Sequence, residues 1–373
     1  MGRNDRRIVS ANIRDDQMIL DGKRVLVTGG TGSLGKTFAR RVLTGEFGTP
    51  KKLIVFSRDE GKQHDMRVDY LHRRKAATDD ILYRNFMNVL EFRIGDVRSP
   101  EDIGIALRDI DIVIHAAALK QVPACEYFPA QAVLTNCVGA INIVQAIQSM
   151  SLPIETVIAV STDKACKPVN VMGMTKALQE RIITCANVLN PNTRFICVRY
   201  GNVLASRGSV IPLFHDQIRA GGPVTITNKR MTRFLLSLEQ AVDTVFAALK
   251  GALPGETYIP IVPGARMIDI ATALIGSRQI EVKITGVRPG EKFDEILISE
   301  EEVNHTIRRD DHYVIRPGLP ELQGEADQQP KALTQEFCSG DFVLDYNGTA
   351  ELLRRNNLMI EDSPNSYGSE FLR

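Results

Sequence analysis

The stretch RVLVTGGTGSLGKTFARRVL, residues 24–43, decides the fold of this chain. Its apolar start is typical of a buried parallel strand, and SLGKTFARRVL has the pattern of a helix. Between them, Gly29, Gly32 and Gly35 have the spacing that permits a tight turn and lets backbone N–H groups approach a pyrophosphate. Glycines also serve ordinary turns, but the strand-turn-helix setting favours nucleotide binding. The predicted contacts are Gly29, Thr31, Gly32, Ser33, Leu34 and Gly35.

Apolar runs continue to alternate with helical patterns after this unit. Further strands are predicted within 52–58, 89–97, 111–119, 156–162 and 194–203, and helices over 132–150 and 172–189. Strands that alternate with helices imply right-handed crossovers and parallel pairing. The sequence therefore predicts an α/β fold, a doubly wound parallel Rossmann-type sheet with a smaller C-terminal substrate-binding lobe.

The domain boundaries follow shifts in composition. We expect an N-terminal extension over 1–22, a nucleotide-binding Rossmann domain over 23–205, and a region over 206–320 that is mostly the substrate-binding lobe. Residues 238–249 have a helical pattern that could return to the main sheet. The polar segment from residue 321 to 373 is interpreted as a tail that either contacts a neighbouring subunit or stays mobile.

The bulk composition excludes several classes of function. The 46 basic and 45 acidic residues give a net charge of +1, which does not favour nucleic acid or an acidic membrane surface as a partner. We found no apolar h-region near the start and no run of about eighteen apolar residues, so we expect a cytoplasmic protein without membrane insertion. The six cysteines lack metal-ligand spacing, so we expect reduced thiols and no metal site.

The ends of the next strands predict the rest of a cofactor site. Ser57 and Arg58 suit a 2′-phosphate, which favours NADP over NAD, although Asp59 could accept the ribose hydroxyls of NAD instead. His115 ends the fourth strand and is interpreted as a structural histidine. Four further residues at strand ends are predicted near the adenine or the nicotinamide: Asp96, Val97, Ala116 and Ala117.

Thr162, Asp163 and Lys164 place a hydroxyl, an acid and a base directly after an apolar strand. Sites in such sheets open at this end, although a structural ion pair would use the same two charges. A lysine acts as a base near neutral pH only if its pKa is lowered. We expect desolvation and positive charge from Lys176 and an oxidised nicotinamide to lower the pKa of Lys164.

A linked set of motifs carries a resemblance that spans residues 23–297. The chain resembles the extended short-chain dehydrogenase/reductase family and, within it, the configuration-inverting UDP-N-acetylglucosamine 4,6-dehydratases of the capsule type. The motifs are TGGTGSLG, FSRDE, GDVR, HAAALKQVPACE, STDKA, PVNVMGMTK, RYGNVLASRGSVIPLF, MTRFLLS and RPGEK. The resemblance implies a tightly bound, recycled NADP, Asp163 as the acid at C6, and Lys164 as the base at C5. Retaining relatives carry glutamate after the aspartate, so Lys164 favours inversion.

Met172 departs from the commonest pattern of this family. Most relatives have tyrosine there to deprotonate the C4 hydroxyl, with a lysine four residues later that holds the nicotinamide ribose. Lys176 keeps that place, and the capsule-type subgroup also carries MGxxK. Our hypothesis is that Asp163, Lys164 or an ordered water takes the C4 proton while Thr162 positions the sugar. The alternative is that Met172 only packs in a core and the protein is inactive.

The resemblance also implies contacts with a UDP-sugar and a homo-oligomer, from dimer to hexamer. The implied substrate residues are Lys120, Asn202, Arg207, Arg233, Arg288 and Glu291. Arginine suits a diphosphate because its guanidinium group can bind phosphate bidentately. Two other functions stay open: a UDP-sugar 4-epimerase, which needs only C4 oxidation and reduction, and a nucleotide-sugar-binding regulator without catalysis.

Overall fold

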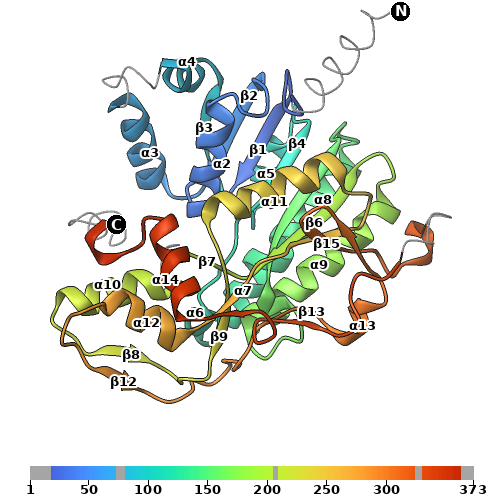
Figure 1. Cartoon of the computed structure of the whole chain (residues 1–373). Coiled ribbons are helices and arrows are strands. Elements are labelled where there is room, and N and C mark those ends of the chain that lie inside the picture. Colours follow the sequence, from blue (N-terminus) through green and yellow to red (C-terminus); the bar gives the residue numbers. More distant parts are fainter. Residues whose placement is uncertain (1–17, 73–79, 205–208, 324–329, 363–373) are drawn as a thin grey trace, which may run out of the picture.

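A nine-stranded sheet forms the centre of the computed structural model, which describes residues 18–72, 80–204, 209–323 and 330–362 (Figure 1). Seven adjacent strands, from β3 to β10 in the order below, are parallel, and β15 and β14 extend the sheet as an antiparallel edge. In spatial order the strands are β14 Thr306–Arg309, β15 His312–Ile315, β10 Thr257–Pro260, β6 Arg194–Tyr200, β5 Thr156–Thr162, β4 Ile112–His115, β1 Arg24–Thr28, β2 Lys52–Ser57 and β3 Leu90–Ile94. The predicted doubly wound parallel sheet is confirmed.

Both faces of this sheet are covered, which explains the continuous apolar runs. Along β1, Val25 and Val27 pack into one core cluster and Leu26 into the other. The first face carries α2 Ser33–Leu43, α3 Glu60–His72, α4 Asp80–Val89 and α11 Leu238–Gly251. The second carries α5 Pro100–Ala106, α8 Gly139–Ser149 and α9 Val171–Leu189. The carboxyl ends of the parallel strands are left at one edge between these layers.

The helix predicted over 132–150 has a more complex local structure. It consists of α7 Pro129–Ala132, a π-helical turn Val133–Val138 and α8. The continuous span Pro129–Ser149 is long and apolar enough to cross a membrane by length and composition, although 61% of its most apolar window is buried inside the protein. This burial is that of a core helix, because α8 packs on α5 and α9.

The smaller lobe has its own apolar core, at the lower left of Figure 1. Its helices are α10 Val210–Arg219, α12 Met267–Ile275 and α14 Tyr346–Arg355. Its strands are β7 Asn202–Val203, β8 Val224–Ile226, β9 Thr232–Leu236, β11 Gly264–Arg266, β12 Val282–Ile284 and β17 Val343–Leu344. Met231, Leu235 and Met267 belong to this core and also line the large cavity described below, so the lobe forms one of its walls.

The chain crosses between the two parts more than once. After residue 206 it returns to the main sheet through α11 and β10, and again through β14 and β15. The segment after residue 321 folds back onto the lobe, where α14 packs on α12 and Leu353 is fully buried. Its contact with a neighbouring subunit stays a prediction. The remaining elements are α6 Val122–Tyr127, η3 Asp163–Ala165, β13 Ile296–Ile298, α13 Glu300–Val303, η4 Pro320–Leu322, β16 Phe337–Cys338 and η5 Ile360–Asp362.

Candidate active site

A cavity of about 1930 Å³ lies at the carboxyl ends of the central strands. Gly29 follows β1, Ala116 follows β4, Thr162 ends β5 and Gly201 follows β6, and all four line it. The smaller lobe supplies the opposite wall, with Arg233 among its residues. This is the position at which ligands bind in doubly wound sheets.

The glycine turn fits a dinucleotide pyrophosphate. Gly29 has φ +66°, and a Cβ atom there would lie 2.7 Å from the Ala117 backbone. A Cβ atom on Gly35 would lie 2.5 Å from the Gly30 backbone, so only glycine lets α2 start this close to β1. Gly32 occupies the N-cap of α2 and brings no side chain to the first-turn N–H groups. These backbone N–H groups are open to a ligand that would bind at the helix N-terminus, where negative charge is favoured. The predicted residues Gly29, Thr31, Gly32, Ser33, Leu34 and Gly35 all line the cavity.

The predicted adenine-side residues lie beside the cavity and not in its lining. Ser57 Oγ is 3.0 Å from Thr31 Oγ1 and accepts a hydrogen bond from the Asp59 backbone. Arg58 is mostly exposed, with Nη1 3.7 Å from the Asp96 carboxylate. Burial favours a raised pKa for Asp96, but hydrogen bonds from Arg98 and the charge of Arg58 outweigh it and lower that pKa. Val97 packs against Gly139.

The fourth strand brings its backbone to the cavity and keeps its histidine away from it. Ala116 and Ala117 line the cavity, next to Gly29. His115 is fully buried, with Nδ1 2.8 Å from Thr28 Oγ1. Burial, with a smaller effect of the Lys176 charge, lowers the pKa of His115 to about 3, so its ring stays neutral. This geometry agrees with the structural interpretation of His115.

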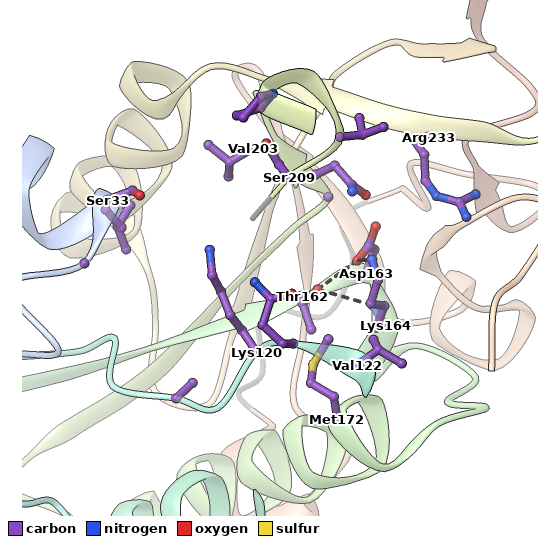
Figure 2. Close-up of a pocket in the computed structure, with 18 of the residues that line it drawn as sticks. Ser33, Lys120, Val122, Thr162, Asp163, Lys164, Met172, Val203, Ser209 and Arg233 are labelled. Atoms are coloured by element: carbon purple, nitrogen blue, oxygen red, sulfur yellow. Dashed lines mark hydrogen bonds and ion pairs between the residues drawn. The ribbon is translucent and has the colours of Figure 1, made fainter. Parts of the chain in front are cut away.

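Thr162, Asp163 and Lys164 form a hydrogen-bonded group at the end of β5, where the chain turns into η3 (Figure 2). The Thr162 hydroxyl donates to Asp163 Oδ1 at 2.7 Å, and Lys164 Nζ donates to the same oxygen at 3.0 Å. Asp163 is fully buried, and its Oδ2 has no hydrogen-bond partner within the described ranges. A hydroxyl, a carboxyl and an amine are therefore connected through a single oxygen atom.

Glu295 joins this group and was not predicted from the sequence. It precedes β13, is 3% exposed, and places Oε1 3.4 Å from Lys164 Nζ and 3.7 Å from Arg233 Nε. Arg233 comes from β9 on the opposite wall (Figure 2). The one available signal was a carboxylate placed directly before the apolar run ILI, just after RPGEK.

The expected lowering of the Lys164 pKa is wrong. Burial does favour a lower pKa, but the Asp163 and Glu295 carboxylates outweigh it and raise the pKa of Lys164, against a smaller opposing effect of Arg233. Lys164 is thus an ammonium whose proton already points at Asp163. Lys164 must lose this proton before it can act as a base, and Asp163 at 3.0 Å is then left as the neighbouring acid.

Met172 and Lys176 lie one turn apart at the start of α9 and both line the cavity. Lys176 Nζ donates to Val160 O at 2.6 Å and to Gln179 Oε1 at 2.5 Å, and burial lowers its pKa to about 8. Met172 is 4% exposed and packs with Cys125 and Ala132. Its side chain extends from the helix toward Thr162 in Figure 2.

The predicted substrate residues gather around the same cavity. Lys120, Asn202, Arg233, Arg288 and Glu291 line it, whereas Arg207 lies outside the described residues. Five lining side chains carry buried polar atoms that have no hydrogen-bond partner in the described parts of the chain: Ser161, Asp163, Asn202, Ser209 and Glu295. Buried polar atoms normally have partners, so these atoms point to a polar ligand. Ser161 and Ser209 were not predicted, although both fall inside quoted motifs. No group of three or more potential metal ligands occurs among the residues searched, which are the described ones, and the predicted absence of a metal stays a prediction.

Comparison with known proteins agrees with this geometry. The "UDP-N-acetylglucosamine 4,6-dehydratase (inverting)" of Campylobacter jejuni is 39% identical over 85% of this chain and 90% of its own length. A "UDP-glucose 4-epimerase" of Rickettsia conorii is 42% identical over 79% of this chain and 82% of its own length. The solved structure of Pen from Bacillus thuringiensis is 32% identical and covers 91% of this chain and all of its own, with a TM-score of 0.79.

The sheet order, the glycine turn and Lys176, four residues after Met172, define a Rossmann-type nucleotide-binding protein of the short-chain dehydrogenase/reductase class. The family model described as "Polysaccharide biosynthesis protein" matches residues 25–317. The chain belongs to this family.

Proposed function

We propose that this protein is an NADP-dependent UDP-N-acetylglucosamine 4,6-dehydratase that inverts C5. The product is a UDP-2-acetamido-2,6-dideoxy-4-hexulose for surface polysaccharide synthesis. The observation that carries the proposal is the group of Thr162, Asp163 and Lys164 at the cavity wall, because elimination of water needs an acid and a base side by side. Epimerisation at C4 would leave the pair without its role in elimination.

The residues present can move each proton that the reaction requires. A bound nicotinamide dinucleotide would supply one chemistry, which is acceptance of the C4 hydride and its return to C6. The C4 hydroxyl proton passes through the Thr162 hydroxyl to Asp163, along the 2.7 Å hydrogen bond, which replaces the missing tyrosine. Lys164 first releases its ammonium proton to solvent water and then, as the amine, takes the proton from C5. Asp163 then gives its proton to the C6 hydroxyl, which leaves as water.

Inversion follows from the fate of C5. After the hydride has reached C6, a proton from solvent water is added to C5 from the face opposite to Lys164, so the configuration at C5 changes. The C4 hydroxyl proton and the C6 hydroxyl together account for the water that is lost. Lys176 donates to neutral oxygens at the base of the cavity, which suits a role in holding a ribose and not in proton transfer.

Two features support NADP within the broader class of nicotinamide dinucleotides. The Asp59 carboxylate accepts from both the backbone and the side chain of Lys62, so it is less available to the ribose hydroxyls of NAD. Arg58 projects from the end of β2 and is 59% exposed, and Lys62 lines the cavity. Denaturation of the purified protein followed by mass spectrometry of the released nucleotide distinguishes NADP from NAD and tests whether the cofactor stays tightly bound.

We also propose a cytoplasmic homo-oligomer. All six cysteines are free, which is typical of a reducing compartment. Large apolar side chains are exposed on α6 and α9 or directly beside them, which is typical of a surface that another subunit covers. They are Tyr127, Phe128, Met174 and Leu178. Light scattering after size-exclusion chromatography gives the number of subunits.

Proton NMR of the protein with UDP-N-acetylglucosamine in deuterated water tests the reaction. A new C6 methyl signal, deuterium at C5 and an altered ring-coupling pattern are expected. Formation of UDP-N-acetylgalactosamine without deuterium would instead establish a 4-epimerase, the activity in the name of the Rickettsia relative. Tight binding of the sugar nucleotide without any product, after addition of NADP, would favour a nucleotide-sugar-binding regulator without catalysis.

A further inference from the structure

Glu295 is a buried carboxylate for which the proposed reaction has no role. It is 3% exposed, lines the cavity, and places Oε1 3.4 Å from Lys164 Nζ. Its Oε2 atom has no hydrogen-bond partner in the described part of the chain. Burial of a carboxylate is costly, so its place beside a reactive amine needs a reason.

The C-terminal segment holds Glu295 in place from both of its backbone groups. The Glu295 N–H donates to Ser339 Oγ at 2.9 Å, and the Ser339 N–H donates to Glu295 O at 2.8 Å. Directly after Glu295, β13 pairs with β16. Ser339 is fully buried, and a Cβ atom on Gly264 would lie 2.0 Å from its carbonyl oxygen. Strand β11 therefore packs directly against Ser339, which holds the Glu295 backbone. Glu295 has little freedom to move away from Lys164.

A structural ion pair with Arg233 would be the simpler explanation of Glu295. The shortest contact of that pair, from Arg233 Nε, is 3.7 Å, and the Arg233 guanidinium donates to Thr232 O at 2.7 Å and to Phe293 O at 3.1 Å. Arg233 is thus held by backbone carbonyls, while Glu295 lies closer to Lys164 than to Arg233. The geometry therefore places the Glu295 carboxylate to interact with Lys164 more closely than with Arg233.

We propose that Glu295 is a positioning residue that acts through Lys164. Its carboxylate fixes the Lys164 amine between two acids and stabilises the ammonium that forms when this amine takes the C5 proton. The proposal rests on the proposed dehydratase function. The carboxylate of a catalytic triad stabilises an imidazolium in the same way.

The sign of the pH effect follows from the groups that face Lys164. These are Asp163, Glu295 and Arg233, and the two carboxylates together keep the pKa of Lys164 above its usual value. Replacement of Glu295 by glutamine removes one negative charge, so the pKa of Lys164 should fall. The amine then becomes available at lower pH but is a weaker base.

Glu295→Gln should change kcat and its pH profile together. We expect kcat to fall by about 10- to 100-fold, as for other partners that orient a reacting group, with the limb that rises with pH moved to lower pH. KM should change by less than about twofold, because uniform substrate binding is retained. The matched control is Glu300→Gln on α13, whose side chain is 73% exposed, and it should behave as the wild type. A Glu295→Gln enzyme with the wild-type pH profile, or with a change in KM alone, would overturn the proposal.

A second measurement does not depend on turnover. Competitive acetylation of the whole protein by acetic anhydride at a series of pH values, read by mass spectrometry, gives the pH midpoint of Lys164, with Lys167 as reference. The midpoint should be lower in Glu295→Gln, and an unchanged midpoint would overturn the proposal even if UDP-N-acetylglucosamine is not the substrate. If Glu295→Gln does not fold, Ser339→Ala, which removes the hydroxyl that holds Glu295, gives the same readout with a smaller shift expected.

Discussion

Lys164 and Lys176 line the same cavity, and their surroundings move their pKa values in opposite directions. Lys164, at the end of β5, lies between the carboxylates of Asp163 and Glu295, and its pKa is raised. Lys176, on α9, lies against a backbone carbonyl and an amide, and burial lowers its pKa to about 8. Burial alone therefore does not prepare a lysine as a base. The charge of the neighbouring groups decides the direction of the pKa shift. Of these two lysines, Lys164 is the one with a carboxyl group within hydrogen-bond distance.

The largest effect should come from the loss of Lys164. Lys164→Ala removes the amine that takes the C5 proton, so we expect turnover to fall by about 10²- to 10⁴-fold, the usual contribution of a general base. Bound nucleotide should remain, because the glycine turn and Lys176 are untouched. Lys167→Ala, an exposed lysine three residues further on, is the control. Methyl-product formation in deuterated water measures the effect, and unchanged turnover in Lys164→Ala would contradict the assignment.

Asp163→Asn removes the group that takes the C4 proton and gives it to C6. The amide cannot give a proton to the C6 hydroxyl, so we expect methyl formation to fall by about 10²- to 10³-fold. The amide also cannot accept the C4 hydroxyl proton through Thr162, so C4 is not oxidised and exchange of deuterium into C5 should fall together with methyl formation, although Lys164 keeps its place beside Glu295. Exchange at C5 that persists while methyl formation is lost would show that another group accepts the C4 proton.

The effect of Lys176 should appear in the pH dependence of the free energy of unfolding and not in proton transfer. Its pKa is about 8 in the folded protein and about 10.5 in an unfolded chain, so between these pH values the unfolded chain holds more protons. The free energy of unfolding should therefore rise with pH across this window, by up to about 3 kcal/mol. Lys176→Met should remove this rise, whereas Lys250→Met at an exposed position of α11 should keep it. Urea unfolding at several pH values measures the difference, and equal slopes in the three proteins would refute it.

Much of the fold could be predicted because its signals are local. The strand, glycine turn and helix at 24–43 are adjacent in sequence, and the apolar runs that follow are long enough to identify buried parallel strands. The same holds for Thr162, Asp163 and Lys164, which share one turn. The π-helical turn at Val133–Val138 could not be predicted, because a helical apolar pattern does not distinguish it from an ordinary turn.

The part of the site that the sequence did not reveal depends on contacts between distant segments. Glu295 meets Lys164 only because β13 pairs with β16 and Ser339 fixes the backbone between them. The expected pKa of Lys164 was wrong for the same reason, since the second carboxylate beside it was unknown. Single residues in a motif can be assigned from the sequence, whereas their electrostatic surroundings require the packing of both lobes.

The smallest effect should come from Met172, the residue that first raised doubt about catalysis. If the C4 proton passes through Thr162 to Asp163, the thioether only fills space beside Cys125 and Ala132. Met172→Leu conserves volume, so turnover should stay within about twofold of the wild type and the cost in stability below about 1.5 kcal/mol. Met172→Tyr adds volume and should not raise kcat, because the relay already exists. A tenfold gain in kcat in the tyrosine variant would show that the C4 step lacks a proton acceptor in this protein. The tyrosine-lysine scheme of the family would then apply, and Met172 would be a loss of its proton-transferring residue.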